Sequence, residues 1–229
     1  LGCGYDQDPI YPSTFRKGPV EIDLHTHLLG ADRIRARRHL IGEDADAVFH
    51  RSVPVDVGGG GLFCLDSFDF ILCHWLHALK HRIGKLIWLI DIEMIVRDWT
   101  AEQWKQFYRH IQARKHRKTM AGWFRLRKQI FAIRPAPSVT NGHEIGPLKR
   151  YTIRKWKKNG ALPSWAPFLF FLPPCGLKSQ IRIIIESIYP RPEILRQVFP
   201  GLSKYPDWFL YVLRTCQILA CLPPFRIKG

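Results

Sequence analysis

The chain has 229 residues, of which 46% are hydrophobic and 13% aromatic, which is enough for one hydrophobic core or for two small ones. Its 35 Lys and Arg against 19 Asp and Glu give a net charge of +16, so we expect anionic partners: phosphates, nucleotides, nucleic acid or an acidic membrane surface. The longest apolar stretches contain Pro and are shorter than the about 20 residues that a bilayer requires, so no transmembrane segment is predicted. The six cysteines show neither a CxxC pair nor the spacing of a zinc site, which favours reduced thiols in a cytoplasmic protein.

The first predicted element is a β-strand from Val20 to Leu28 (VEIDLHTHL), in which polar and apolar residues alternate with period two. One face of this strand carries the acids and histidines: Glu21, Asp23, His25 and His27. Residues two apart in a strand lie on the same side, about 6.5 Å from one another, so these side chains form a row of potential metal or proton ligands. The pattern predicts one wall of an active site, and a solvent-facing strand without function is the alternative.

A hairpin and three helices are predicted next. Residues 53–65 indicate two short strands joined by the turn Gly58–Gly61. Asp66 or Ser67 can cap the first helix. Gly84 interrupts the chain before the second helix, and Thr100 can cap the third. Apolar residues recur at helical spacing in all three: Ile71, Leu72, Trp75, Leu76 and Leu79, then Leu86, Leu89, Ile92 and Val96, then Trp104, Phe107, Tyr108 and Ile111.

The remaining chain is predicted to begin with a connection. Residues 134–147 are rich in Pro, Gly, Asn and Ser, and together with the following basic run they predict a loop or linker over residues 134–160. Residues 161–229 predict a helical section of short helices separated by Pro, with a final helix near Trp208 to Leu222. The sequence thus predicts strands only before residue 66 and helices in residues 66–133 and 161–229.

Three histidines in the first predicted helix are spaced three and four residues apart: His74, His77 and His81. They share one helix face, which suits a metal ion or a phosphate, although a polar face that bonds to neighbouring elements is the alternative. Asp91 lies within an apolar run of the next helix. A carboxylate there is expected to pair with His77, His81 or Lys80, or to point into a site.

Two stretches concentrate basic residues, 109–128 and 149–158, with aromatic residues between them. Such a mixture can follow a phosphate backbone while the aromatic rings stack on bases, and a solvated basic surface is the alternative. The candidate contacts to phosphate or nucleic acid are Arg114, Lys115, Arg117, Lys118, Lys155, Lys157 and Lys158.

The HxH sequence of His25 and His27 also resembles the metal-binding strand end of metal-dependent amidohydrolases. That enzyme class requires a barrel of eight alternating β and α units with further His and Asp ligands on later strands. After Gly30 the sequence predicts one hairpin and then helices. The pattern therefore favours another origin for the acidic strand.

Three segments taken in order resemble the uncharacterised nucleotidyltransferase family of bacteria: IDLHTHL, LDSFDFIL after the hairpin, and HALKHRIGKLIWLIDIEMIVRDW. The family carries an acid-Leu-His strand, a Leu-Ser-x-x-Asp helix start, and a His…Lys-His…Leu-x-Trp-Leu-x-Asp helical pair. The C-terminal run from Tyr189 to Arg214 also resembles this family's ending.

The resemblance implies an α+β fold, the remnant of a nucleotidyltransferase-like mixed β-sheet in residues 1–65 followed by a predominantly helical domain. It implies transfer of a nucleoside monophosphate from an NTP to an unknown acceptor, with Mg²⁺ as cofactor. Asp23 would be a metal-site carboxylate, with Glu21 and His25 as supporting neighbours. The helical positions of the family pattern are matched by His77, Lys80, His81, Trp88 and Asp91.

The family's Gly-Ser turn and acidic pair have no match in this sequence. We therefore expect the chain to be an incomplete and inactive fragment, with the turn and the two acids encoded upstream of Leu1. A non-catalytic basic module that binds nucleic acid or another polyanion is the alternative to the enzyme.

Overall fold

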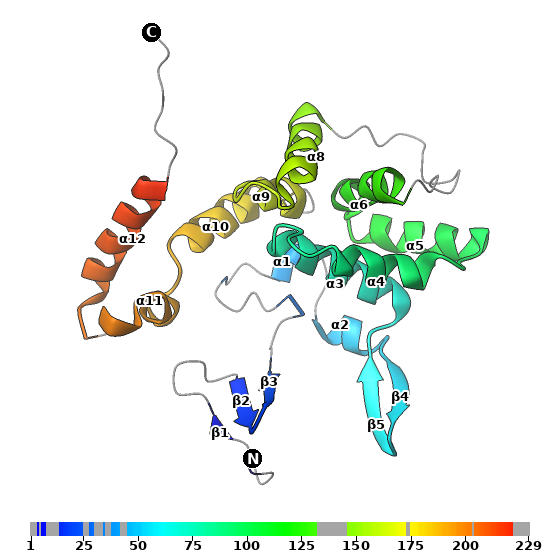
Figure 1. The fold of residues 1–229 in the computed structure, drawn as a ribbon, viewed down its shortest axis with the longest axis horizontal. Coiled ribbons are helices and arrows are strands. Elements are labelled where there is room, and N and C mark those ends of the chain that lie inside the picture. The colour runs from blue at the N-terminus through cyan, green and yellow to red at the C-terminus, as the bar shows by residue number, and fades with distance from the viewer. Residues whose placement is uncertain are drawn as a thin grey trace. The chain divides into compact units, whose positions relative to one another are not determined.

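The computed structural model of the chain describes residues 4, 6–7, 14–24, 28–29, 34, 38–41, 45–131, 146–172, 175–202 and 204–221. The fold is α+β, with mostly helices and two small antiparallel sheets (Figure 1). The chain divides into two compact units: residues 1–35 together with 181–229, called here the sheet unit, and residues 36–180, called the helical unit. Among the described helices, none is long and apolar enough to cross a membrane.

The sheet unit contains the predicted acidic strand. Three antiparallel strands follow the order β1-β2-β3, with bounds Asp6–Gln7, Thr14–Lys17 and Val20–Asp23. The strand that was predicted to reach Leu28 is thus observed from Val20 to Asp23, and His25 and His27 lie outside the described residues. Its apolar side chains Val20 and Ile22 are 47% and 40% exposed, so within the described residues this face of the sheet is not covered.

The C-terminal helices confirm the prediction of short elements separated by Pro. They are α10 Leu177–Ile188, which crosses the boundary between the units, then α11 Pro192–Val198, the 3₁₀ helix η2 Pro200–Leu202 and α12 Asp207–Cys221. Pro192 is at the start of α11, where its missing N–H costs nothing. Arg196 of α11 pairs with Asp207 of α12 at 2.6 Å and so bridges the two helices.

The helical unit holds the largest buried side chains. Its main helices are α3 Ser67–Lys80, α4 Ile87–Val96, α5 Ala101–Ala113 and α6 Arg117–Ile130. Asp66 caps α3 as predicted, and Thr100 caps α5 in a reciprocal arrangement with Gln103. The helices meet around Trp75, Trp123 and Phe107, all fully buried. This aromatic core confirms the predicted stripes with two exceptions: Leu86 is 49% exposed, and Tyr108 is only partly buried.

A two-stranded hairpin projects from the helical unit (Figure 1). It consists of β4 Val53–Val57 and β5 Gly60–Cys64 and follows the short helices α1 Arg38–Ile41 and α2 Ala45–Phe49. Gly58 and Gly59 both have positive φ and form the turn, because glycine adopts this conformation without steric cost. The hairpin was predicted at these residues.

The stretch predicted as a linker, residues 134–160, contains a helix instead: α8 Pro147–Asn159, followed by α9 Ala166–Phe171. Pro147 suits the first helical position, and Gly160, with φ +70°, ends the helix in the left-handed conformation. Thr152 and Ile153 of this helix are buried against the rest of the helical unit. Composition indicated a linker, but these caps and the buried face favour a helix. Residues 132–145 lie outside the described residues.

Candidate functional site

Asp23, the predicted metal ligand, is the last residue of β3. Across the sheet it lies opposite Thr14, and Glu21 lies opposite Arg16. The carboxylate of Glu21 accepts a hydrogen bond from Arg16 Nε at 2.8 Å, and both side chains are about half exposed. Exposed pairs of this kind contribute about 1 kcal/mol or less, so Glu21 can leave Arg16 at little cost.

The helical residues carried over from the family pattern gather where α3 meets α4. The ring centroids of His77 and His81 lie 4.6 Å apart. They lie 5.5 and 5.4 Å, respectively, from the ring centroid of Trp88. Nε2 of His74 lies 3.5 Å from Asp91 Oδ2. Burial lowers the pKa of His74, although the charge of Asp91 works in the opposite direction.

Asp91 pairs with His74, which was not among the partners predicted for it. The reason is the position of the turn between the helices, at Arg82–Ile83. His74 and Asp91 lie equally far along the chain from this turn, and so do His77 and Trp88, so the antiparallel helices bring each pair side by side.

The turn itself is held in an unfavourable conformation. Arg82 and Ile83 have φ of +62° and +52°, which is costly for a β-branched residue. Arg82 Nε donates to the carbonyl of Leu162 at 2.6 Å, and the N–H of Leu162 donates back to the Arg82 carbonyl at 2.8 Å. Trp156 Nε1 of α8 donates to the Ile83 carbonyl at 2.9 Å. Elements far along the chain thus fix the geometry of the His77, His81 and Trp88 cluster.

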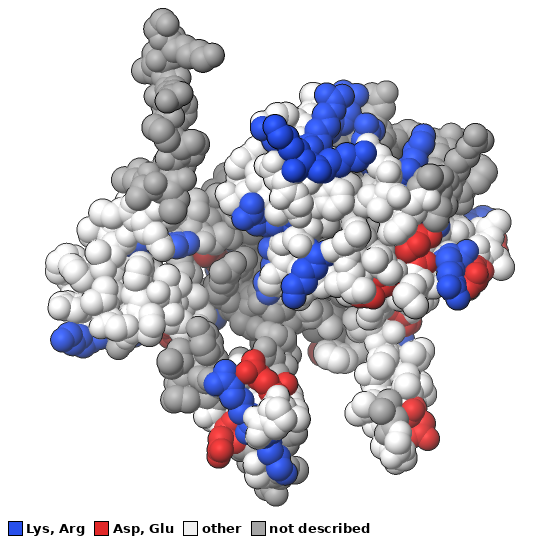
Figure 2. All heavy atoms as spheres, viewed as in Figure 1, with Lys and Arg blue, Asp and Glu red and all other residues white. Residues whose placement is uncertain are grey.

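The predicted phosphate contacts have different surroundings. Lys115, Lys118, Lys157 and Lys158 are exposed, and Lys155 is partly exposed. The guanidinium of Arg117 lies 5.0 Å from the centre of the Tyr108 ring. Arg114 is 13% exposed and lies against a buried carboxylate. Lys and Arg side chains gather most densely over α8 (Figure 2).

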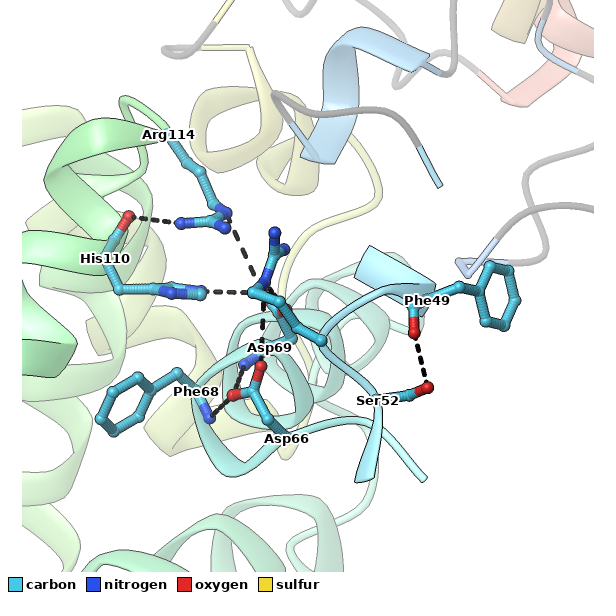
Figure 3. Close-up of polar contacts among 8 residues, drawn as sticks. Phe49, Ser52, Asp66, Phe68, Asp69, His110 and Arg114 are labelled. Carbon is cyan, nitrogen blue, oxygen red and sulfur yellow. Dashed lines mark hydrogen bonds and ion pairs between the residues drawn. The ribbon is translucent and has the colours of Figure 1, made fainter. Parts of the chain in front are cut away.

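Among the described residues of the helical unit, the most buried carboxylate is that of Asp69, which was not among the predicted site residues (Figure 3). It lies in the first turn of α3, and its side chain is 3% exposed. Arg51 Nε donates to Oδ2 at 2.8 Å, His110 Nε2 lies 2.7 Å from Oδ1, and Arg114 Nε lies 3.9 Å from Oδ1. We call these four residues the Asp69 cluster.

The partners determine the charge of Asp69. Burial alone would raise the pKa of its carboxyl, but the close contact with His110 and the hydrogen bond from Arg51 hold that pKa well below its usual range. Asp66 behaves in the opposite way, because burial and the negative charge of Asp69 raise its pKa. An ionised carboxylate enclosed by cations joins the segment before β4 to α3 and α5. The arrangement of the Asp69 cluster is that of a structural ion-pair network.

A second polar side chain, His116, is fully buried at the start of α6. Its Nε2 donates to the carbonyl of Ile41 in α1 at 2.8 Å. Burial lowers the pKa of His116 to about 4, so the ring is neutral at neutral pH.

A family model described as Uncharacterised nucleotidyltransferase matches residues 2–132, more than half of the chain. The matched range contains β1 to β5 and α1 to α6. The C-terminal run from Tyr189 to Arg214, which resembled the same family, lies outside it. No curated protein and no solved structure matches the chain.

Proposed function

Because this chain belongs to the uncharacterised nucleotidyltransferase family, we propose that its reaction is the transfer of a nucleoside monophosphate from an NTP to an acceptor. The bond that breaks joins the α- and β-phosphates, so pyrophosphate leaves as the acceptor oxygen bonds to the α-phosphorus. The observation that carries this proposal is the family match over residues 2–132, which includes the Asp23 strand and the helical positions from His77 to Asp91.

A magnesium site of this kind would supply positive charge to the triphosphate and would favour loss of the proton from the acceptor hydroxyl. The described residues contain no group of three or more His, Cys, Asp or Glu that could hold a metal ion. We propose Asp23 as one carboxylate ligand, with Glu21 and His25 beside it.

A separate proposal concerns the helical positions of the family pattern, which all lie within the helical unit. His77, Lys80 and His81 bring nitrogen donors to one part of the helical unit, and the contacts of His77 and His81 with Trp88 favour binding of a nucleotide over metal coordination. Asp91 is engaged by His74, so we propose that it positions α4 against α3 and does not act on the substrate.

The test uses protein produced from the complete open reading frame. Pyrophosphate release from each of the four NTPs is measured with Mg²⁺ and cellular RNA, DNA and protein fractions as acceptors. We expect release with at least one NTP, and we expect Asp23→Asn to lower its rate by about a hundredfold or more, because a lost metal ligand removes charge stabilisation of the transferring phosphate.

The matched control is Asp98→Asn, which removes one carboxylate from an 82% exposed side chain paired only with its neighbour Arg97 among the contacts observed. It is expected to keep the wild-type rate. Absence of release with every NTP would contradict the proposal for the reaction, and an unchanged rate in Asp23→Asn would contradict the role of Asp23.

A further inference from the structure

The charged side chains of helix α8 are all positive. Its 13 residues contain no Asp or Glu and six Lys or Arg: Lys149, Arg150, Arg154, Lys155, Lys157 and Lys158. Figure 2 shows these cations as the densest positive area in that view. Nothing in the proposed transfer reaction requires this concentration on a helix outside the family match.

The inward side of α8 is fixed by contacts within the helical unit. Thr152 and Ile153 are buried, and Trp156 donates to the Ile83 carbonyl. Lys149 also faces inward, since its Nζ donates to the Lys118 carbonyl at 3.2 Å and lies 4.9 Å from the centre of the Phe170 ring. These four residues define the opposite side as the outward face.

The outward face presents a regular row of cations. Arg150, Arg154 and Lys158 are spaced by four residues, and all three are exposed. At about 1.5 Å rise per residue, neighbouring members of the row are about 6 Å apart along the helix axis. Such a row offers three successive positive charges to an extended chain of anions.

Repulsion between the three cations of this row destabilises the helix. Like charges four residues apart destabilise a helix by about 0.2 to 0.5 kcal/mol per pair. In the described part of the chain, no carboxylate forms an ion pair with Arg150, Arg154 or Lys158 that would offset this repulsion. An external anion would relieve it.

An aromatic ring lies beside the row. Tyr151 is 48% exposed, and Lys155 Nζ lies 5.7 Å from the centre of its ring. Unlike Trp156, this ring is available to a ligand, and a nucleobase can stack on an exposed aromatic ring next to a cation. Anionic lipid offers phosphates but no base to occupy such a ring.

We propose that the α8 face, defined as Arg150, Tyr151, Arg154, Lys155 and Lys158, binds single-stranded nucleic acid. The phosphates lie along the row Arg150, Arg154 and Lys158, and one base stacks on Tyr151. This binding goes beyond the transferase proposal, because it depends on the α8 surface and not on Asp23.

The test is direct binding of fluorescein-labelled 12-nucleotide oligo(U) and oligo(dT) to the full chain, followed by fluorescence anisotropy over a series of KCl concentrations. The variant Arg150→Gln, Arg154→Gln and Lys158→Gln keeps good helix formers and removes three charges. Three lost phosphate contacts are expected to reduce the slope of log K against log salt by about 2, at about 0.7 per contact.

The matched control removes three exposed charges elsewhere in the helical unit, through Arg97→Gln, Lys105→Gln and Lys128→Gln. It has the same net charge as the row variant and is expected to keep the wild-type slope. Tyr151→Leu is expected to weaken binding about tenfold while leaving the slope unchanged, since it removes stacking and no charge.

Three results would overturn the proposal. One is an equal reduction of the salt slope in the row variant and in the control, which would indicate general attraction to a cationic protein. Another is an affinity for a 12-base-pair duplex that equals the affinity for the single strands, together with unchanged binding by Tyr151→Leu. This result would exclude base stacking. The third is binding to phosphatidylserine vesicles through the same residues without binding to either oligonucleotide, which would assign the surface to a membrane.

Discussion

The helical unit and the three-stranded sheet bury their apolar residues to very different extents. Trp75, Phe107 and Trp123 are completely buried in the helical unit, whereas Val20 and Ile22 of β3 are 47% and 40% exposed. The helical unit thus carries its own hydrophobic core, whereas Val20 and Ile22 add little buried apolar surface to the sheet within the described residues. Similar substitutions should therefore have unequal effects in the two regions.

The largest difference is expected for deletion of apolar side chains. Phe107→Ala should destabilise the helical unit by about 3 to 5 kcal/mol, because it leaves a cavity among aromatic rings. Ile22→Ala should cost about 1 kcal/mol or less, since its side chain is already partly in water. Urea unfolding followed by tryptophan fluorescence and by circular dichroism measures both. Equal losses would contradict the difference in packing.

Two ion pairs of equal length give a sharper comparison. Arg51 to Asp69 and Arg16 to Glu21 both measure 2.8 Å, but the carboxylate side chains are 3% and 52% exposed. Asp69→Asn should cost about 3 to 5 kcal/mol, because it removes the buried negative charge that Arg51, His110 and Arg114 surround. Glu21→Gln should cost less than about 1 kcal/mol. The same unfolding experiment tests them, and a large effect of Glu21→Gln would show that the sheet depends on this pair.

The pH dependence of stability should also come from the helical unit. The pKa of His116 is about 4 in the folded chain against 6.5 as its ordinary value, so the unfolded chain binds the additional proton between these values. Stability is therefore complete above about pH 6.5 and falls by about 3 kcal/mol as the pH drops toward 4. The pKa of Asp69 is shifted below its ordinary value of 3.8, so its contribution is lost only at still lower pH.

Unfolding free energies measured from pH 7 to pH 4 check this assignment. His116→Gln retains an N–H donor for the Ile41 carbonyl but does not titrate, so its stability should change less over this range than that of the wild-type chain. An identical pH profile for the two proteins would exclude His116 as the cause.

A smaller effect is expected where α6 approaches its neighbours closely. A Cβ at Gly122 would lie 2.7 Å from Phe170 Cε1 and 3.2 Å from Trp75 Cζ2. Gly122→Ala should destabilise the chain by about 1 to 3 kcal/mol despite the better helix propensity of Ala. Gly201→Ala, whose Cβ would meet nothing within 4 Å, is the control, and thermal unfolding distinguishes them. An increase in stability in Gly122→Ala would contradict the close packing.

Local sequence signals predicted the hairpin and the helices α3, α4 and α5 of the helical unit. The helical spacing of apolar residues and the capping residues Asp66 and Thr100 were sufficient to place α3 and α5. Both signals depend only on residues that are close together in the sequence. The hairpin followed from the glycines at its turn for the same reason. The α+β fold could be expected from these signals together with the family resemblance.

Contacts between distant residues could not be predicted in the same way. Asp69 belongs to a visible LDSFD helix start, but its partners Arg51 and His110 come close only after the helices pack. The pairing of Asp91 with His74 depends on the left-handed turn at Arg82 and Ile83, for which the sequence offers no glycine. Helix α8 was predicted as a linker because most of its residues are charged or polar. Its buried side includes only two fully buried residues, Thr152 and Ile153, which is too short a pattern to indicate a helix.

The proposed function requires that the β3 strand takes part in binding the nucleotide. Hydrogen exchange along the protein from the complete open reading frame, with and without NTP and Mg²⁺, tests it most directly. Amides of α3 and α6 are predicted to exchange slowly in both conditions, and amides of β2 and β3 to slow down when nucleotide binds. Slower exchange confined to other elements, with β3 unchanged, would contradict the claim.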